Sequence, residues 1–302
     1  MNTALITNSF KKELWEFHKT LFWLPLIIAA LIVITPFAQL MLLEDYQVNK
    51  IFMVLEELHH ATQLDQLSNG TLAVVNGLFV PFLMIGFVIQ LYYFVNCLFD
   101  ERRDLSVYFW RSLPVSDATT VGVKLLTGAL VIPAIFMVGA TLSLLVYAVM
   151  AFVACIVLAA GYDISLWHLW GHADILSTLA GTWLTLLPYA LWMFPVYAWL
   201  MLASMFAKKA PFLWAVIPVA AILVVEAFIV EYFHLRQGFF SETLIEYFGF
   251  MSDMHGHHIE IKDPSKLSLA QALSEKVSLM GVLLGAAFIG ATYWLRSNRS
   301  HP

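Results

Sequence analysis

Long runs of hydrophobic positions, separated by short polar stretches, organise this chain of 302 residues. A helix needs about 20 apolar residues to cross the ~30 Å hydrocarbon core of a membrane. Six runs meet that length, and they cover residues 20–43, 71–99, 121–150, 177–206, 211–232 and 277–296. The pattern therefore predicts an all-α polytopic membrane protein whose six transmembrane helices form a single domain over residues 1–302.

Two of these runs are unusual. In the third, apolar residues continue from Val121 to Ala160, and about forty helical residues reach ~60 Å, twice the hydrocarbon core. This run could be one long helix that projects outward, one span with a re-entrant piece, or two spans. In the fourth, Pro188 and Pro195 predict kinks, since proline cannot donate its backbone hydrogen bond within a helix.

The distribution of positive charge favours six spans over seven. Loops on the cytoplasmic side of a membrane are enriched in Lys and Arg. With the N-terminus inside and six spans, the inner side holds Lys11, Lys12, Lys19, Arg102, Arg103, Arg111, Lys124, Lys208, Lys209, Arg296 and Arg299. A seventh span would move the last four outside. We therefore expect a multi-pass protein of the cytoplasmic membrane, with both termini cytoplasmic and residues 233–276 as the largest outer segment.

The composition agrees with a membrane protein. The chain is 61% hydrophobic and 12% charged, whereas soluble domains are about 45–50% apolar and about 25% charged. The formal net charge of −5 argues against a nucleic-acid partner. Cys97 and Cys155 both lie in apolar runs, so we expect buried thiols rather than a disulfide. The first apolar run is preceded by polar residues and reads as a retained span.

Additional helices are expected outside the spans. Residues 8–19 alternate apolar and charged positions at helical spacing, which predicts an N-terminal helix in the membrane interface or a simpler charged anchor. Ile51, Leu55 and Leu58 predict an amphipathic helix within the outer loop 44–70.

The last helix has a recognisable start and a small-residue face. Ser268 and Gln271 match a capping box, which predicts one helix from about Ser268 to about Leu295. Within it, Gly281 and Gly285 form a GxxxG motif, a pattern that allows close packing against another helix.

Polar and aromatic side chains inside the predicted spans are candidates for a substrate path. Glu226 lies ~22 Å along the fifth span, where a charge must face protein or water. Gln90, Tyr189 and Trp192 are the other candidates. The alternatives are that the fifth span unwinds early, that Gln90 joins helices, and that the aromatic residues contact lipid.

Histidines gather in the predicted outer loops. Those of the stretch MHGHHIE, namely His255, His257 and His258, could bind a soft or borderline metal, but their spacing matches no known site. We favour surface histidines without a metal.

The loop at 100–120 stands apart from an ordinary membrane turn. Five charges, Asp100 to Asp104, are followed at once by a cluster of aromatic residues. Ser116 or Asp117 can cap the start of the third span, and Pro114 breaks the preceding turn. We therefore expect a brief helix at roughly 104–112, between the second and third spans. Apolar side chains rimmed by charges suggest a docking surface, although aromatic residues in the interface belt would give the same composition.

The segment Leu91–Leu126, LYYFVNCLFDERRDLSVYFWRSLPVSDATTVGVKLL, resembles bacterial permease subunits of ATP-binding-cassette exporters of the ABC-2 type. A DER-D-S-FW-SLPVSD pattern recurs in them, and the six-span layout with an N-terminal interfacial helix is similar to theirs. By that resemblance the loop is a coupling helix that sits in a cleft of the ATPase subunit. The coupling residues it implies are Asp100, Glu101, Arg102, Arg103, Asp104, Phe109, Trp110, Arg111, Leu113 and Pro114.

The resemblance also implies the partners. Two copies of a separate ATPase would bind ATP and Mg²⁺, and a second permease, identical or paralogous, would complete the exporter. The chain itself contains no G-x-x-x-x-G-K-[ST] phosphate loop, so we expect neither a catalytic residue nor a cofactor in it.

Two other functions compete with transport. One is a membrane scaffold or sensor. The other is an intramembrane hydrolase, which Glu56, Glu57, His59 and His60 suggest; however, these residues lie in a predicted outer loop rather than within a span.

Overall fold

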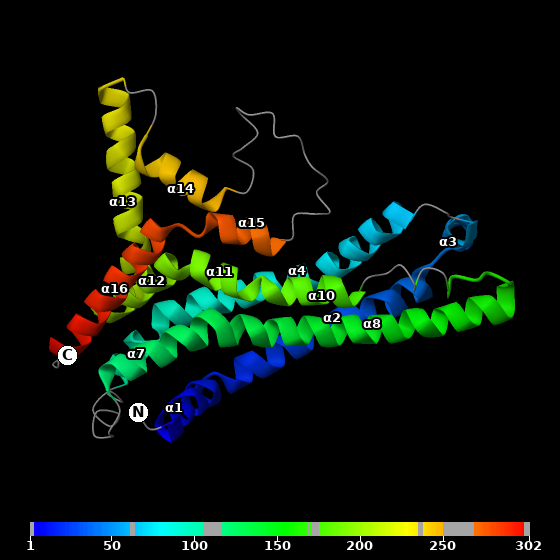
Figure 1. Ribbon diagram of the computed structural model, residues 1–302, viewed down its shortest axis with the longest axis horizontal. Helices are drawn as coiled ribbons and strands as arrows, with labels where there is room; N and C mark the ends of the chain where they lie inside the picture. The colour runs from blue at the N-terminus through cyan, green and yellow to red at the C-terminus, as the bar shows by residue number, and fades with distance from the viewer. Residues whose placement is uncertain are drawn as a thin grey trace. The chain divides into compact units, whose positions relative to one another are not determined.

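The computed structural model describes residues 3–60, 64–104, 116–167, 170, 175–234, 238–249 and 269–298, and the regular elements in these ranges are all helices (Figure 1). Six helices in this part of the chain are long and apolar enough to cross a membrane: His18–Gln39, Val74–Arg103, Asp117–Tyr162, Ile175–Trp192, Pro211–Tyr232 and Leu279–Asn298. The six predicted spans are confirmed in number and approximate place, and the chain is a multi-pass membrane protein.

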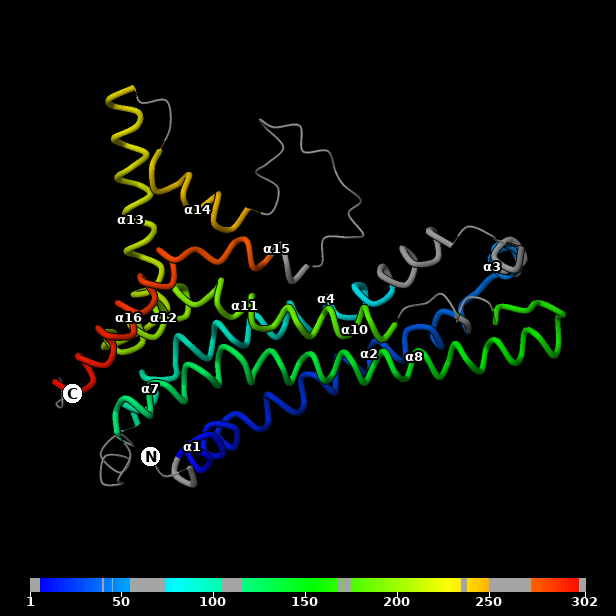
Figure 2. The backbone as a smooth tube through the Cα atoms, in the orientation of Figure 1, coloured from blue at the N-terminus to red at the C-terminus, as the bar shows by residue number. Residues whose placement is uncertain are grey.

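The third span is one long helix. It consists of α7 (Asp117–Leu126), a π-helical turn η1 (Thr127–Val131) and α8 (Ile132–Tyr162), which follow one another without a break (Figure 2). Ser116 caps its start, since the Ser116 hydroxyl accepts a 3.1 Å hydrogen bond from the Thr119 amide. The 46 residues extend about 70 Å at 1.5 Å per residue. Of the three predicted alternatives, the single long helix is therefore the one that forms.

The fourth span is divided into three helices, α10 (Ile175–Leu184), α11 (Leu186–Trp192) and α12 (Phe194–Phe206). Pro188 has no N–H to offer the carbonyl group four residues earlier, and the helix is interrupted at Thr185. Pro195 lies in the first turn of α12, where a proline is tolerated. The predicted kinks are confirmed, but residues 177–206 do not form one continuous span.

The helices divide into two compact units. One unit comprises Lys11–Ile89 and Leu130–Leu186. Within it α2 (His18–Leu42) packs along α8, and the Tyr147 hydroxyl donates a 2.8 Å hydrogen bond to the Ile32 carbonyl. This bond joins the two helices through a partly buried hydroxyl.

The other unit comprises Met1–Phe10, Gln90–Ala129 and Leu187–Pro302. Its most extensive packing joins α12 to α16 (Leu279–Asn298). A side chain at Gly285 would place its Cβ 2.6 Å from the Phe194 ring, so the two helices approach closely where α16 has no side chain. The GxxxG prediction is confirmed at this glycine.

Two predicted helices outside the spans are present, as α1 (Thr3–Glu16) and α3 (Asp45–His60). Their location at the membrane surface stays a prediction.

The prediction that the last helix is continuous is wrong. It consists of α15 (Leu269–Lys276) and α16, which are separated at Val277 and Ser278. The Ser278 hydroxyl accepts a 2.9 Å hydrogen bond from the Gly281 amide, so Ser278 caps a new helix. The helix that begins beside the predicted capping box is therefore α15 and not the membrane span, and Ser268 itself lies outside the described residues.

Candidate functional site

Four charges form a cluster at the base of the charged loop, and three of them are buried. Glu101, in the short helix α5 (Phe99–Arg103), lies 3.2 Å from the Lys124 ammonium group and 3.1 Å from the Arg296 guanidinium group. Arg296 also donates a 2.8 Å hydrogen bond to Asp117. Glu101, Lys124 and Arg296 are each at most 3% exposed. Two acids and two bases therefore meet as a neutral network, of which only the Asp117 side chain, 25% exposed, reaches the surface.

Such a network fixes three elements together. Glu101 belongs to α5, Asp117 and Lys124 to α7, and Arg296 to α16. Taking each charge out of water costs several kcal/mol, which only well-placed partners offset. Removing one charge leaves its partners without compensation, so the cluster favours the one arrangement of the three helices in which all four charges are paired.

A second set of bonds ties α5 to α12. Arg102 donates hydrogen bonds of 2.8 and 2.7 Å to the carbonyls of Ser204 and Ala207, at the end of α12, where carbonyls have no partner within the helix. In return, the Ser204 hydroxyl accepts from the amides of Leu98 and Phe99, at 3.2 and 3.0 Å. Each helix thus satisfies the free backbone groups of the other.

The remaining charges of the loop are more exposed than Glu101, and two of them, Arg103 and Asp104, lie at the surface. The Arg103 side chain is 61% exposed and lies 3.3 Å from Asp100 and 3.1 Å from Asp104. Its guanidinium group also lies 5.9 Å from the centre of the Phe99 ring. Of the five charges predicted to contact a partner, Glu101 and Arg102 are therefore engaged inside the chain, Asp100 is partly buried, and Arg103 and Asp104 are exposed.

The predicted coupling residues Phe109, Trp110, Arg111, Leu113 and Pro114, with most of the predicted helix 104–112, lie outside the described residues.

The sequence pattern placed Lys124 and Arg296 only among the positive charges on the inner side of the membrane. For Asp117 it predicted only a helix cap. The signal that could have found the cluster is the position of Lys124 in the first turns of an apolar helix, because a charge inside a membrane helix needs a partner.

Two of the four predicted substrate-path residues bind each other. The Gln90 amide donates a 2.8 Å hydrogen bond to the Gly128 carbonyl and accepts one of 2.9 Å from the Tyr189 hydroxyl. Gly128 lies in η1, where the wider π-helical turn changes the local backbone pairing. Gln90 is fully buried, so these contacts agree with the alternative that it joins helices.

The other two contact α14 (Phe240–Phe248). Trp192 donates a 3.2 Å hydrogen bond to the Tyr247 carbonyl, and the Tyr247 hydroxyl donates back to the Trp192 carbonyl. Burial raises the pKa of Tyr247 to about 12, so this hydroxyl keeps its proton at neutral pH.

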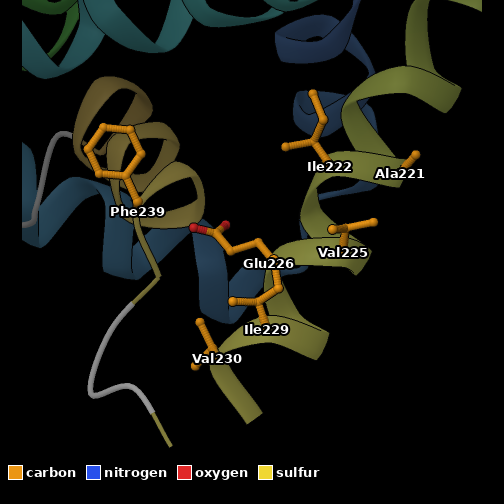
Figure 3. A pocket seen from close by; sticks show the side chains of 7 residues that line it. All are labelled: Ala221, Ile222, Val225, Glu226, Ile229, Val230 and Phe239. Atoms are coloured by element: carbon orange, nitrogen blue, oxygen red, sulfur yellow. The ribbon is translucent and has the colours of Figure 1, made fainter. Parts of the chain in front are cut away.

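Glu226 accepts from the first two amides of α14, those of Phe240 and Ser241, and its carboxylate points toward the segment that carries Phe239 (Figure 3). The interpretation that the fifth span unwinds early is wrong, because α13 (Pro211–Tyr232) continues beyond Glu226. The position of Glu226 at the membrane interface, which the same interpretation implies, stays a prediction.

In the described part of the chain, no group of three His, Cys, Asp or Glu side chains could hold a metal ion. The candidates His255, His257 and His258 lie outside that part.

Comparisons with protein-family models, with curated proteins and with solved structures found no match to this chain. The resemblance of residues 91–126 to ABC-2 permeases therefore stays a prediction.

Proposed function

We propose that this chain is the transmembrane permease subunit of an ABC-2-type exporter. A separate ATPase subunit, present in two copies, would bind and hydrolyse ATP with Mg²⁺. A second permease, identical or paralogous, would complete the complex in the cytoplasmic membrane. Both termini and the loop at 100–120 would be cytoplasmic, and the chain itself would carry no catalytic site.

The observation that carries this proposal is the way the loop is anchored. Glu101 precedes residues 105–115 and Asp117 follows them, and both acids bind Arg296 of a membrane-spanning helix. Movement of Glu101 or Asp117 would therefore be passed to α5, α7 and α16 together. Arg103 and Asp104 are exposed, and in the sequence they precede the aromatic residues of the segment that resembles ABC-2 permeases. A docking loop needs such exposed charges next to apolar side chains.

The mechanism follows from population shift. ATP binding closes the ATPase pair, and the docked loop moves with it. The loop then has two positions, one with the ATPase pair open and one with it closed. The transmembrane helices change conformation only to the extent that the ATPase binds these two positions with different affinity. The buried charge cluster transmits this displacement and takes no part in bond breaking.

Co-purification tests the proposal. The tagged chain is co-expressed with the ATP-binding-cassette ATPase encoded nearest to its gene, and bound ATPase and its rate of ATP hydrolysis are measured. We expect the ATPase to co-purify with the wild-type chain. Arg103→Glu and Trp110→Ala should each reduce retention by about tenfold or more, because residues central to an interface carry most of its binding energy.

Lys209→Glu is the matched control. It reverses an exposed positive charge in another loop that is expected on the same side of the membrane. This variant should retain the ATPase. Full retention and full activity in both loop variants, or no ATPase bound to the wild-type chain, would refute the assignment.

A further inference from the structure

Within its membrane helices, the chain passes from one compact unit to the other at three junctions. They lie between Ile89 and Gln90, between Ala129 and Leu130, and between Leu186 and Leu187. A fourth junction, between residues 10 and 11, lies in the N-terminal helix α1. Any movement of one unit against the other must be absorbed by the backbone at these few positions.

Two of the three membrane junctions coincide with irregular backbone. Ala129 and Leu130 lie in the π-helical turn η1, and α11 begins at Leu186, directly after the interruption at Thr185. A π-turn pairs residues five apart, whereas an α-turn pairs residues four apart, and such turns are also sites of helix bending. Hinges between rigid bodies use positions of this kind, where a few residues absorb the change in backbone angles.

The remaining junction, in α4 (Leu64–Asn96), lies beside a side chain that binds the other two segments. The Gln90 amide donates a 2.8 Å hydrogen bond to the Gly128 carbonyl of η1 and accepts one of 2.9 Å from the Tyr189 hydroxyl of α11. The Tyr197 hydroxyl also interacts with the Gln90 and Tyr189 side chains. All these groups belong to the same unit. One buried glutamine therefore joins α4, η1 and α11 next to the three junctions.

α4 and the third span are in close contact on both sides of their junctions. Within one unit, a Cβ at Gly128 would lie 2.3 Å from the Phe94 ring of α4. Within the other unit, a Cβ at Gly86 of α4 would lie 3.0 Å from the Phe136 ring of α8. Neither helix can bend without the other, so a bend in α4 near Gln90 requires one in η1.

We propose that α4 at Gln90, the turn η1 and the interruption at Thr185 form a hinge on which the two units turn, and that Gln90 locks it. The bonds of Gln90 to Gly128 and Tyr189 hold the hinge in one conformation and break in the other. The membrane interior offers no water to replace them, so they favour the locked conformation. The inference concerns movement within this chain and holds or fails independently of the proposed ATPase partner.

Double electron–electron resonance on the purified full-length chain in lipid nanodiscs tests the hinge. Cys97 and Cys155 are replaced by alanine, and spin labels are attached at exposed positions. Val153→Cys with Tyr293→Cys measures a distance between the units, and Val153→Cys with Phe22→Cys measures one within a single unit. We expect two populations of distances for the first pair and one for the second.

Two variants release the lock. Gln90→Met keeps the length of the side chain and removes both hydrogen bonds, whereas Tyr189→Phe removes one. Each should raise the minor population between the units about three- to tenfold, equivalent to ~0.6–1.4 kcal/mol for a hydrogen bond between membrane helices. The distance within one unit should not change.

Tyr147→Phe is the matched control. It removes the 2.8 Å hydrogen bond from the Tyr147 hydroxyl to the Ile32 carbonyl, which joins two helices within one unit, and the distances between the units should stay as in the wild type. Unchanged distances between the units in both Gln90→Met and Tyr189→Phe would overturn the proposal, as would an equal change in Tyr147→Phe. If Gln90→Met does not fold, Tyr189→Phe decides alone, because it keeps the bond from Gln90 to Gly128.

Discussion

Glu101→Gln is expected to lower the free energy of unfolding by about 3–5 kcal/mol, the cost of removing one partner from a buried ion pair. Glutamine has a similar shape but a single acceptor oxygen. Its amide NH₂ group would therefore face either Lys124 or Arg296, a donor against a donor. The four-charge cluster would also change from neutral to a net positive charge. Thermal unfolding of the purified chain in detergent measures the effect.

Two variants control for this result. Asp104→Asn also removes an acid from the loop, but the Asp104 side chain is 60% exposed and an exposed ion pair contributes only about 0–1 kcal/mol. In the double variant Glu101→Gln/Lys124→Met, one acid and one base are lost together, so the cluster is again neutral and part of the stability should return. A melting temperature of Glu101→Gln equal to that of Asp104→Asn would contradict the buried network.

Gly128→Ala is expected to destabilise the chain by about 1–3 kcal/mol, the usual cost of overpacking a filled interior. A Cβ at this position would lie 2.3, 2.7 and 2.8 Å from three atoms of the Phe94 ring. Phe94 cannot easily retreat, because it is fully buried and its ring stacks on Tyr197 at a centroid distance of 4.5 Å. Gly128 also lies in η1, so the added methyl group would disturb the π-helical turn.

Gly122→Ala is the matched control on the same long helix. A Cβ at Gly122 meets no atom within 4 Å, so alanine should stabilise the chain by up to about 1 kcal/mol through its higher helix propensity. Thermal unfolding of the two variants should therefore shift in opposite directions. Equal shifts would show that Phe94 does not occupy the space beside Gly128.

The membrane spans were predictable because they depend on local composition. A helix in lipid satisfies its backbone within one segment, so the hydrophobic pattern alone predicts where each crossing lies. The prolines of the fourth span indicated its interruptions for a similar reason, since Pro188 acts on its own helix. The break before α16 was missed because Ser268 and Ser278 are both good capping residues, and pattern alone does not decide which begins the span.

The candidate site was predicted only in part. The position of the charged loop and its resemblance to a coupling segment follow from neighbouring residues. The neighbouring residues do not predict that Glu101 and Arg102 bind within the chain while Arg103 and Asp104 are exposed. This difference depends on which side of a five-residue helix contacts α7, α12 and α16. The same holds for Glu226, whose partners include the backbone amides of Phe240 and Ser241, because backbone amides carry no sequence signal.

The sequence by itself determined that this protein is helical, that six of its helices are long and apolar enough to cross a membrane, and that a charged loop follows the second of them. These properties depend on hydrophobic length and on charges near one another along the chain. Only the tertiary structure decided that Glu101, Lys124, Asp117 and Arg296 meet in one cluster. Arg296 lies 195 residues from Glu101, and such a pairing exists only when the packing of α5, α7 and α16 brings the three helices together.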